Sequence, residues 1–244
     1  MDALELVHHT SGLIGAAGAA FYFAPATIAR GQELGLDRVQ FYGLGRGGVL
    51  GDVEPAVVSS AFGYFNPAMI ANLWNAAREK CSPRVAGAAY MECCAEHGRA
   101  RFADVPDLES FVAAGEKVLA ACEVEAFPLF AGTAAEPAAP DAAGRAMQIL
   151  TILREYRGCA HLVALRAMGI PSKDAHFVKR PGDIRMFGWA DDDAPTIDDD
   201  LRARMDDAEA LTDRMVVPAF AVLSDAEREV FATGVRALAD VLAA

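Results

Sequence analysis

Basic residues are scarce in this chain. Of its 244 residues, 22 are Lys or Arg and 34 are Asp or Glu, which gives a formal net charge of -12. Proteins that bind nucleic-acid backbones or anionic lipid surfaces generally do so through a basic surface. We therefore expect neither a nucleic acid nor a membrane as a partner of this protein.

Cysteines and the common metal-binding motifs are also sparse. The five cysteines include no CxxC pair, and the chain has no HExxH or repeated ExxH motif. Cys93, Cys94 and His97 share a predicted helix, but Cys81 is the one obvious further zinc ligand nearby, and two are needed. We expect reduced thiols and no metal site.

The reduced thiols, together with an N-terminus that lacks the basic segment of a signal peptide, favour a cytoplasmic protein.

The chain has one uncharged stretch long enough to raise the question of a membrane span, residues 10–29. It consists mostly of small residues and contains Pro25, which favours a buried helix. Within it, Ser11, Gly12, Gly15, Ala16 and Ala19 are spaced to form one small-residue face. Such a face predicts close approach by another helix.

Aromatic residues make up 8% of the chain and much of its hydrophobic content is alanine, which indicates closely packed helices. We predict a mainly α fold, made of two packed helical halves with helix-turn-helix or winged-helix-like parts and at most short β-hairpins. Strands are expected only at Val39–Tyr42 and Ile184–Phe187. Prolines and capping residues at Asn66-Pro67, Ser82-Pro83 and Ser172 mark helix starts. The predicted helices are 2–22, 26–34, 54–62, 66–79, 83–101, 107–124, 142–167, 172–180, 197–215 and 224–243.

An Ala/Pro-rich segment bounded by Gly132 and Gly144 divides the chain. We predict an N-terminal helical part over 1–130, a connection over 131–144 and a C-terminal, winged-helix-like part over 145–244. The two parts share a sequence echo, since 28–36 and 162–170 both place a helix, a glycine stop and an apolar residue in the same order. Two related helix-turn-helix-like halves would explain this echo.

The segment 43–48, Gly-Leu-Gly-Arg-Gly-Gly, satisfies the dinucleotide-binding pattern G-x-G-x-x-G. Its context differs from that of a dinucleotide fold, because Gly51 and Pro55 interrupt the helix that should follow and no alternation of strands and helices is present. We expect a glycine-rich structural turn. Arg46 at its tip would lie on a flexible loop that covers an anionic ligand.

Arg154, Arg157 and His161 lie on one stripe of the predicted helix 142–167, at offsets of three, four and seven residues. Apolar neighbours flank the stripe, so the arginines should be partly buried and held by hydrogen bonds. Gly158 within this helix suggests close approach of a ligand or a partner backbone. Alternatively, both arginines form ion pairs with carboxylates of this acid-rich chain.

A second candidate group is aromatic. Phe62, Tyr64, Phe65 and Trp74 surround the predicted helix start at Asn66-Pro67. They form either part of the hydrophobic core or the wall of an apolar pocket.

Several phrases of the sequence together resemble an actinobacterial family that is labelled SalK-like or helix-turn-helix. The phrases lie at 22–25, 45–52, 60–68, 153–161 and 210–220 and so extend over most of the chain in order. The resemblance implies a mostly helical fold with winged-helix-like parts. It implies no particular activity. The family pattern has a His where Tyr156 stands and a polar or acidic residue where Cys159 stands, so a site that uses those positions does not carry over.

The DNA-binding role that a helix-turn-helix label suggests can be tested against charge. The recognition helix would be Ser172–Arg180, whose cations are Lys173, Lys179 and Arg180. Residues 171–214 contain twelve Asp or Glu against seven Lys or Arg, so a duplex docked there would meet a repulsive surface.

Two functions remain open from the sequence. The first is a helical protein that binds a small anionic or carboxylated molecule between its halves, and whether it also catalyses a reaction is left open. The alternative is a transcriptional regulator or interaction module of degenerate winged-helix type. A homodimer fits either, and the sequence leaves the question of a haem or flavin cofactor open. For the first function the candidate acid/base residues are His161 and Glu155, and the candidate ligand-binding residues are Arg154, Arg157, Arg46, Asn66, Tyr22 and Asp213.

Overall fold

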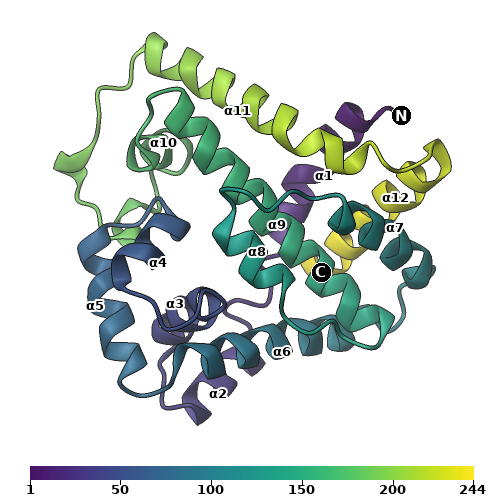
Figure 1. Ribbon diagram of the computed structural model, residues 1–244, viewed down its shortest axis with the longest axis horizontal. Helices are drawn as coiled ribbons and strands as arrows, with labels where there is room; N and C mark the ends of the chain where they lie inside the picture. Colours follow the sequence, from purple (N-terminus) through teal and green to yellow (C-terminus); the bar gives the residue numbers. More distant parts are fainter.

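The computed structural model describes all residues, 1–244, and consists of helices without any strand (Figure 1). It confirms the predicted mainly α class, and every predicted helix is present. The α-helices are α1 (Ala3–Ala17), α2 (Pro25–Glu33), α3 (Arg38–Gly48), α4 (Pro55–Phe62), α5 (Pro67–Arg78), α6 (Pro83–Phe102), α7 (Leu108–Ala120), α8 (Pro128–Ala134), α9 (Ala142–Ala167), α10 (Ser172–Lys179), α11 (Asp199–Phe220) and α12 (Asp225–Ala243).

Local sequence explains where most of these helices begin. Asn66 and Ser82 accept hydrogen bonds from backbone N–H groups of the first turns of α5 and α6, and each is followed by a proline at the first helical position. Asp2, Asp37 and Ser224 form capping boxes at the starts of α1, α3 and α12. None of the helices is both long and apolar enough to cross a membrane.

The two predicted strands are wrong. Val39–Tyr42 lies in α3, and Ile184–Phe187 is a 3-10 turn, η1, that is followed by a second one, η2 (Asp191–Asp193). Without strands the chain has no β wing, so the winged-helix-like parts are helix-turn-helix units only. The short aromatic runs suggested strands, but the capping box at Asp37 starts a helix that continues through the glycines.

The glycines at 43–48 belong to this helix and not to the turn that the sequence predicted. A Cβ atom on Gly48 would lie 2.0 Å from the carbonyl oxygen of Pro83 and 2.9 Å from the nitrogen of Gly87. Gly45 meets the ring of Tyr90 in the same way. The glycines therefore allow α3 and α6 to pack backbone against backbone, which explains the motif without a nucleotide.

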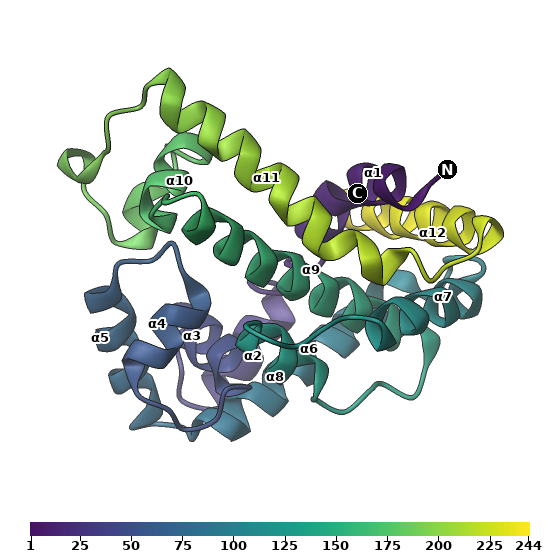
Figure 2. The ribbon, with the colours of Figure 1, turned by 45° about the horizontal axis from the view of Figure 1, so that its top comes forward.

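Helix α9 lies at the centre of the molecule, packed against α1, α6, α7, α8 and α11 (Figures 1 and 2). Most of its residues are buried, and one hydrophobic core includes side chains from both sides of the predicted connection, from Leu6 to Leu238. Residues 131–134 of that connection form the end of α8. The division into two halves stays a prediction.

A smaller apolar cluster joins the C-terminal end of α9 to α10 and α11 through Leu165, Ile170, Ala175 and Met205. The turn between α9 and α10 places Gly169 at φ +68°, and Ile170 N–H donates to Leu165 O. The turn between α2 and α3 is equivalent, with Gly35 at φ +77° and Leu36 N–H donating to Gly31 O. The two segments of the sequence echo thus fold into the same helix-turn-helix connection.

Candidate functional site

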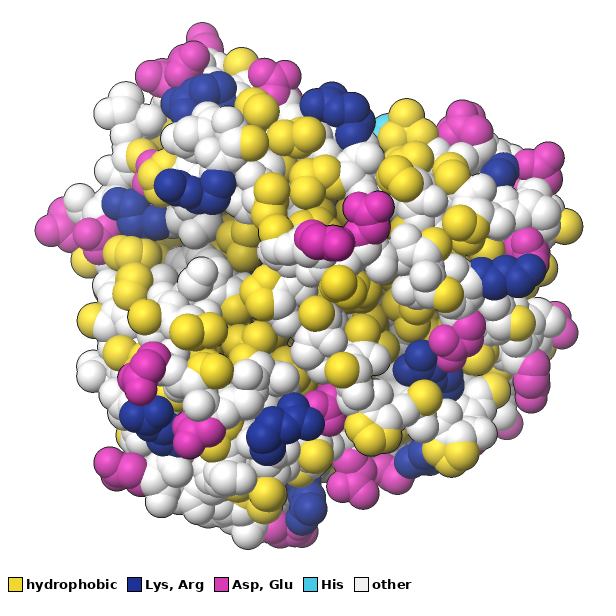
Figure 3. All heavy atoms as spheres, in the orientation of Figure 1, with side chains coloured by type: hydrophobic (Ala, Val, Ile, Leu, Met, Phe, Trp, Pro, Cys, Tyr) yellow, Lys and Arg dark blue, Asp and Glu magenta, His cyan; other side chains and the backbone are white.

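A cavity of about 470 Å³ lies between α9 and the helices that surround it. Its walls come from α1, α3, α4, α8, α9, α10 and α11, from the segment after α4 and from η1, and we call it the central cavity. On the face shown in Figure 3, hydrophobic side chains gather in a hollow in the region of α4, α8 and α9. Arg154, Arg157 and His161 of the α9 stripe all line the cavity, as the sequence suggested for a common site.

Glu155 is the centre of a buried polar network on this wall. Arg46 donates to both carboxylate oxygens, from Nε to Oε1 at 3.0 Å and from Nη2 to Oε2 at 2.7 Å. The Tyr22 hydroxyl and Arg154 Nη1 donate to Oε1 at 2.9 and 3.0 Å. The guanidinium of Arg46 also lies 4.5 Å from the ring centroid of Phe62. The network joins α3, α9 and the turn after α1, which carries Tyr22, through a carboxylate that is 3% exposed.

The electrostatics of Glu155 contradict its predicted role as an acid/base residue. Burial alone would raise the pKa of its carboxyl, but the charges of Arg46 and Arg154 outweigh burial and lower the pKa to about 2. Glu155 is therefore a fixed anion with saturated acceptors. Arg46 lies on the rigid helix α3 and not on the flexible loop that the sequence predicted, and its partner is this carboxylate.

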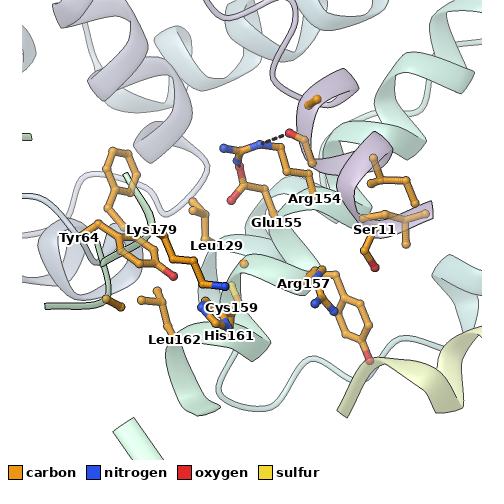
Figure 4. Close-up of a pocket in the computed structure, with 18 of the residues that line it drawn as sticks. Ser11, Tyr64, Leu129, Arg154, Glu155, Arg157, Cys159, His161, Leu162 and Lys179 are labelled. Atoms are coloured by element: carbon orange, nitrogen blue, oxygen red, sulfur yellow. Dashed lines mark hydrogen bonds and ion pairs between the residues drawn. The ribbon is translucent and has the colours of Figure 1, made fainter. Parts of the chain in front are cut away.

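Arg154 keeps donor capacity that the protein does not use. Its Nε donates to Gly15 O at 3.1 Å (Figure 4). Its Nη1 donates to Tyr22 and Glu155. Nη2 has no hydrogen-bond partner in the protein, and the side chain is 26% exposed. A planar guanidinium held in place by three other groups is suited to an incoming carboxylate.

Arg157 forms ion pairs with carboxylates of this chain, which was the alternative considered from the sequence. Its Nη1 donates to Asp213 at 2.7 Å and its Nη2 to Glu209 at 3.1 Å, both on α11. Asp213 also contacts His8 Nε2 at 2.9 Å. Asp213 thus holds Arg157 and is not itself part of the cavity lining.

His161 is half-buried on the cavity wall, where its Nδ1 lies 3.0 Å from the Thr212 hydroxyl. Burial lowers the pKa of the imidazole, and the charges of Arg157 and Lys179 act in the same direction, while Glu209 opposes them. Lys179 extends across the cavity toward His161 in Figure 4. His161 is therefore neutral at neutral pH, with one nitrogen left for another partner.

The opposite wall is aromatic and was found only in part from the sequence. Phe62, Tyr64 and Phe65 line the cavity, whereas Trp74 is fully buried in the core. Phe187 of η1 stacks on Phe65 with ring centroids 4.1 Å apart and lies 4.0 Å from the ring of His176. Sequence analysis missed further lining residues, among them Tyr42, His176, Lys179, Arg180, Phe187 and Glu209. Their positions in the chain carry no shared pattern that could have grouped them.

Three glycines give the cavity a bare backbone wall. A Cβ atom on Gly12, Gly15 or Gly158 would meet nothing within 4 Å, and all three line the cavity. The predicted helix contact at Gly12 and Gly15 is therefore wrong, and close approach occurs instead at Gly18, which faces Leu150 O of α9. Gly158 meets open space, so no partner backbone approaches it, and the alternative of a ligand stays a prediction.

Two remaining candidates lie outside the cavity. Asn66 caps α5 and donates from its side chain to Gly188 O at 3.1 Å. Tyr22 lies behind Arg154, under its guanidinium, and acts through the Glu155 network. Nowhere in the structure do three His, Cys, Asp or Glu side chains gather in a way that could hold a metal ion.

A family model described as a helix-turn-helix family matches residues 8–204 of the chain. The matched region contains both turns described above and nearly all of the cavity wall. No curated protein and no solved structure matches the chain.

Proposed function

The chain belongs to this helix-turn-helix family, and we propose that it uses the fold to bind a small carboxylated molecule in the central cavity. The observation that carries this proposal is the free Nη2 of Arg154, a charged donor directed by its other bonds and left without a protein partner at the cavity wall. We further propose that the protein acts in the cytoplasm and belongs to the actinobacterial SalK-like group.

The charge of the lining supports an anionic ligand. The cavity wall carries five cationic side chains and two carboxylates in a chain whose net charge is -12. Asp213, just behind the wall, is a third carboxylate because it pairs with Arg157. Five minus three leaves two uncompensated positive charges around the cavity, where low polarity strengthens their attraction for an anion. The cations are Arg46, Arg154, Arg157, Lys179 and Arg180, and the carboxylates are Glu155 and Glu209.

The aromatic wall supports an apolar body for the ligand. Tyr42, Phe62, Tyr64, Phe65 and Phe187 line the cavity on the side of α3, α4 and η1. A volume of about 470 Å³ lies in the usual range for small-molecule sites, and mainly apolar walls with a few polar anchors are typical of such sites. A planar aromatic acid fits this combination.

His161 is the group best placed for a proton transfer to or from the bound molecule, because Nε2 of His176, the second imidazole of the wall, is fully buried. The pKa of Glu155 is too low for it to give or take a proton at neutral pH, whereas an imidazole titrates near neutrality. His161 also lines the same cavity as Arg154, so it can reach a ligand that Arg154 anchors.

The family match favours a second candidate, a DNA-binding regulator. In the structure, however, the would-be recognition helix α10 is covered. No residue from Ser172 to Val178 is exposed, and Lys173 donates to Asp193 O while its Nζ lies 5.6 Å from the ring centroid of Trp189. A recognition helix must present several side chains to a major groove. Only Lys179 of α10 is exposed, and its ammonium lies 3.5 Å from Glu209.

Calorimetry with naphthoate and its neutral amide, naphthamide, tests the ligand proposal. The purified protein should bind naphthoate at least tenfold more tightly than naphthamide, since a charge-assisted bond to Arg154 contributes about 1.5–3 kcal/mol. The Arg154→Gln variant should lose this preference. The Arg204→Gln variant removes a surface arginine that is paired with Asp200 and should keep it. Equal binding of the two compounds by the wild type would contradict the proposal.

A gel-retardation experiment separates the second candidate from the first. We expect no shift of a mixed-sequence duplex at moderate salt, because residues 171–214 carry twelve acidic and seven basic side chains. Sequence-selective retardation that survives moderate salt would establish the regulator instead. Native mass and the absorbance spectrum of the purified protein decide its oligomeric state and whether a haem or flavin accompanies it.

A further inference from the structure

The hydrogen bonds of Thr212 determine which nitrogen of His161 carries a proton. Thr212 is fully buried on α11, and its Oγ1 lies 2.7 Å from Ala208 O and 3.0 Å from His161 Nδ1. A carbonyl oxygen only accepts, so the single hydroxyl proton of Thr212 must point to Ala208 O. The hydroxyl oxygen can then only accept from His161, and Nδ1 must be the N–H.

The other nitrogen, Nε2, consequently carries no proton and presents a lone pair. Burial keeps His161 neutral, and a neutral imidazole has one N–H. Around it, Arg157 and Lys179 oppose protonation, whereas Glu209 and Asp213 of α11 favour it less strongly than burial disfavours it. Nε2 lies 4.0 Å from Glu209 Oε1, which is beyond hydrogen-bond distance, and no protein group donates to it.

Among the imidazole and carboxylate groups of the cavity wall, Nε2 of His161 is the accessible acceptor that is left free. Nε2 of His176 also has no partner, but that atom is fully buried. Glu155 is saturated by Arg46, Arg154 and Tyr22. Glu209 is engaged by Arg157 and by the ammonium of Lys179. A ligand that presents a hydroxyl or N–H group therefore finds its partner at His161.

We propose that Thr212 is a positioning residue that fixes the lone pair of His161 on Nε2, and that the ligand of the central cavity carries a hydrogen-bond donor in addition to its carboxylate. The second part rests on the proposed function. The ligand class is then a hydroxylated or amino-substituted aromatic acid, with the carboxylate at Arg154, the donor at His161 and the ring against the aromatic wall.

Nitrogen NMR of the histidine side chains tests the first part without any ligand. In the wild type and in Thr212→Ser, the His161 signals at neutral pH should show a protonated Nδ1 and an unprotonated Nε2. In Thr212→Val, which has nearly the same shape but no acceptor, the population should move toward the Nε2–H form. A wild-type spectrum dominated by the Nε2–H form would overturn the assignment, and this result does not depend on the variant folding.

Calorimetry with a set of hydroxynaphthoates, each matched by its methoxynaphthoate, tests the second part. Both substituents accept hydrogen bonds, but only the hydroxyl donates. At least one hydroxyl position should bind roughly tenfold more tightly than its methoxy partner in the wild type and in Thr212→Ser, and Thr212→Val should reduce that ratio to about two or less.

The outcomes separate the two proposals. If naphthoate itself fails to bind, the proposed function is wrong, and the NMR result still decides the role of Thr212. If naphthoate binds but no hydroxyl position is preferred, the donor requirement is wrong while the carboxylate site stands.

Discussion

At the residue scale, the charged side chains on one face of α9 have different partners, although their regular spacing suggests similar surroundings. Arg154 shares Glu155 with Arg46 and keeps its terminal Nη2 free, whereas both terminal nitrogens of Arg157 donate to carboxylates of α11. The difference follows from the neighbours, because Arg154 faces α1 and α3 and Arg157 faces the acidic helix α11. Removing a partner from a buried ion pair leaves an uncompensated charge, which is costly.

The Glu155→Gln variant should lower the free energy of unfolding by about 3–5 kcal/mol, because it leaves Arg46 buried without a counterion. The pKa of Glu155 is lowered from 4.5 to about 2 in the folded protein, so its stabilisation is complete above pH 4.5 and is lost as the pH falls toward 2. Urea unfolding at several pH values measures both effects. The variant should show a weaker loss of stability over that pH range than the wild type.

Glu209→Gln is the matched control for this measurement. Glu209 pairs with Arg157 at 3.1 Å and with Lys179 at 3.5 Å, and its side chain is 37% exposed, so its replacement should cost no more than about 1 kcal/mol. Equal losses for the two variants would show that the Glu155 network does not carry the stability that its burial implies.

At the element scale, the glycines of α3 and α9 have opposite roles although both lie inside helices. Gly48 lets α3 approach α6 so closely that no side chain fits between them. Gly158 on α9 faces the open cavity and contacts nothing. A glycine within a helix costs about 1 kcal/mol relative to alanine, and only at Gly48 does packing offset that cost. At Gly158 no packing offsets the cost, and the missing side chain leaves that volume to the cavity.

Alanine substitutions should therefore act in opposite directions. Gly158→Ala should raise the free energy of unfolding by up to about 1 kcal/mol and weaken naphthoate binding, since the added methyl group enters the cavity. Gly48→Ala should lower the free energy of unfolding by about 1–3 kcal/mol, because the added methyl group would overpack against Pro83. Thermal melts and calorimetry measure the two quantities. A Gly158→Ala variant that binds as tightly as the wild type would place the ligand away from this wall.

At the scale of the whole molecule, α9 ties the two predicted halves together. Its hydrogen bonds reach α1 at Gly15 O and Gly18 O, and its ion pairs reach α3 and α11. Figure 2 shows α11 lying along α9, with α1 and α12 beside each other at one end. The central cavity exists only where these elements meet, so neither part of the chain contains a complete site.

Separate expression of residues 1–134 and 142–244 tests this dependence. Neither fragment should unfold cooperatively on heating, because one hydrophobic core uses side chains from both. Circular dichroism should show helical signal with a broad melt, and equimolar mixing should restore a sharp transition and naphthoate binding. A sharp melt for either fragment alone would show that the halves are independent domains.

The sequence by itself determined the positions of ten of the twelve α-helices and the charge of the molecule, whereas α3 and α8 were not predicted. Prolines, capping residues and apolar periodicity act over three or four residues, so they are readable in the chain, and α9 was predicted with its bounds Ala142–Ala167. The same local information placed Arg154, Arg157 and His161 on one helix face. It failed at α3, where the glycines that indicate a turn are compatible with a helix only because α6 packs against them.

Only the tertiary structure decided what the side chains of the site do. Arg46 and Glu155 are 109 residues apart, and His161 and Thr212 are 51 apart, and no local pattern relates such pairs. Burial and neighbouring charges then set their protonation: two arginines lower the pKa of Glu155 to about 2 against the effect of burial, whereas burial lowers the pKa of His161. The stripe on α9 was visible in the sequence, but its partners depend on which helices lie against it.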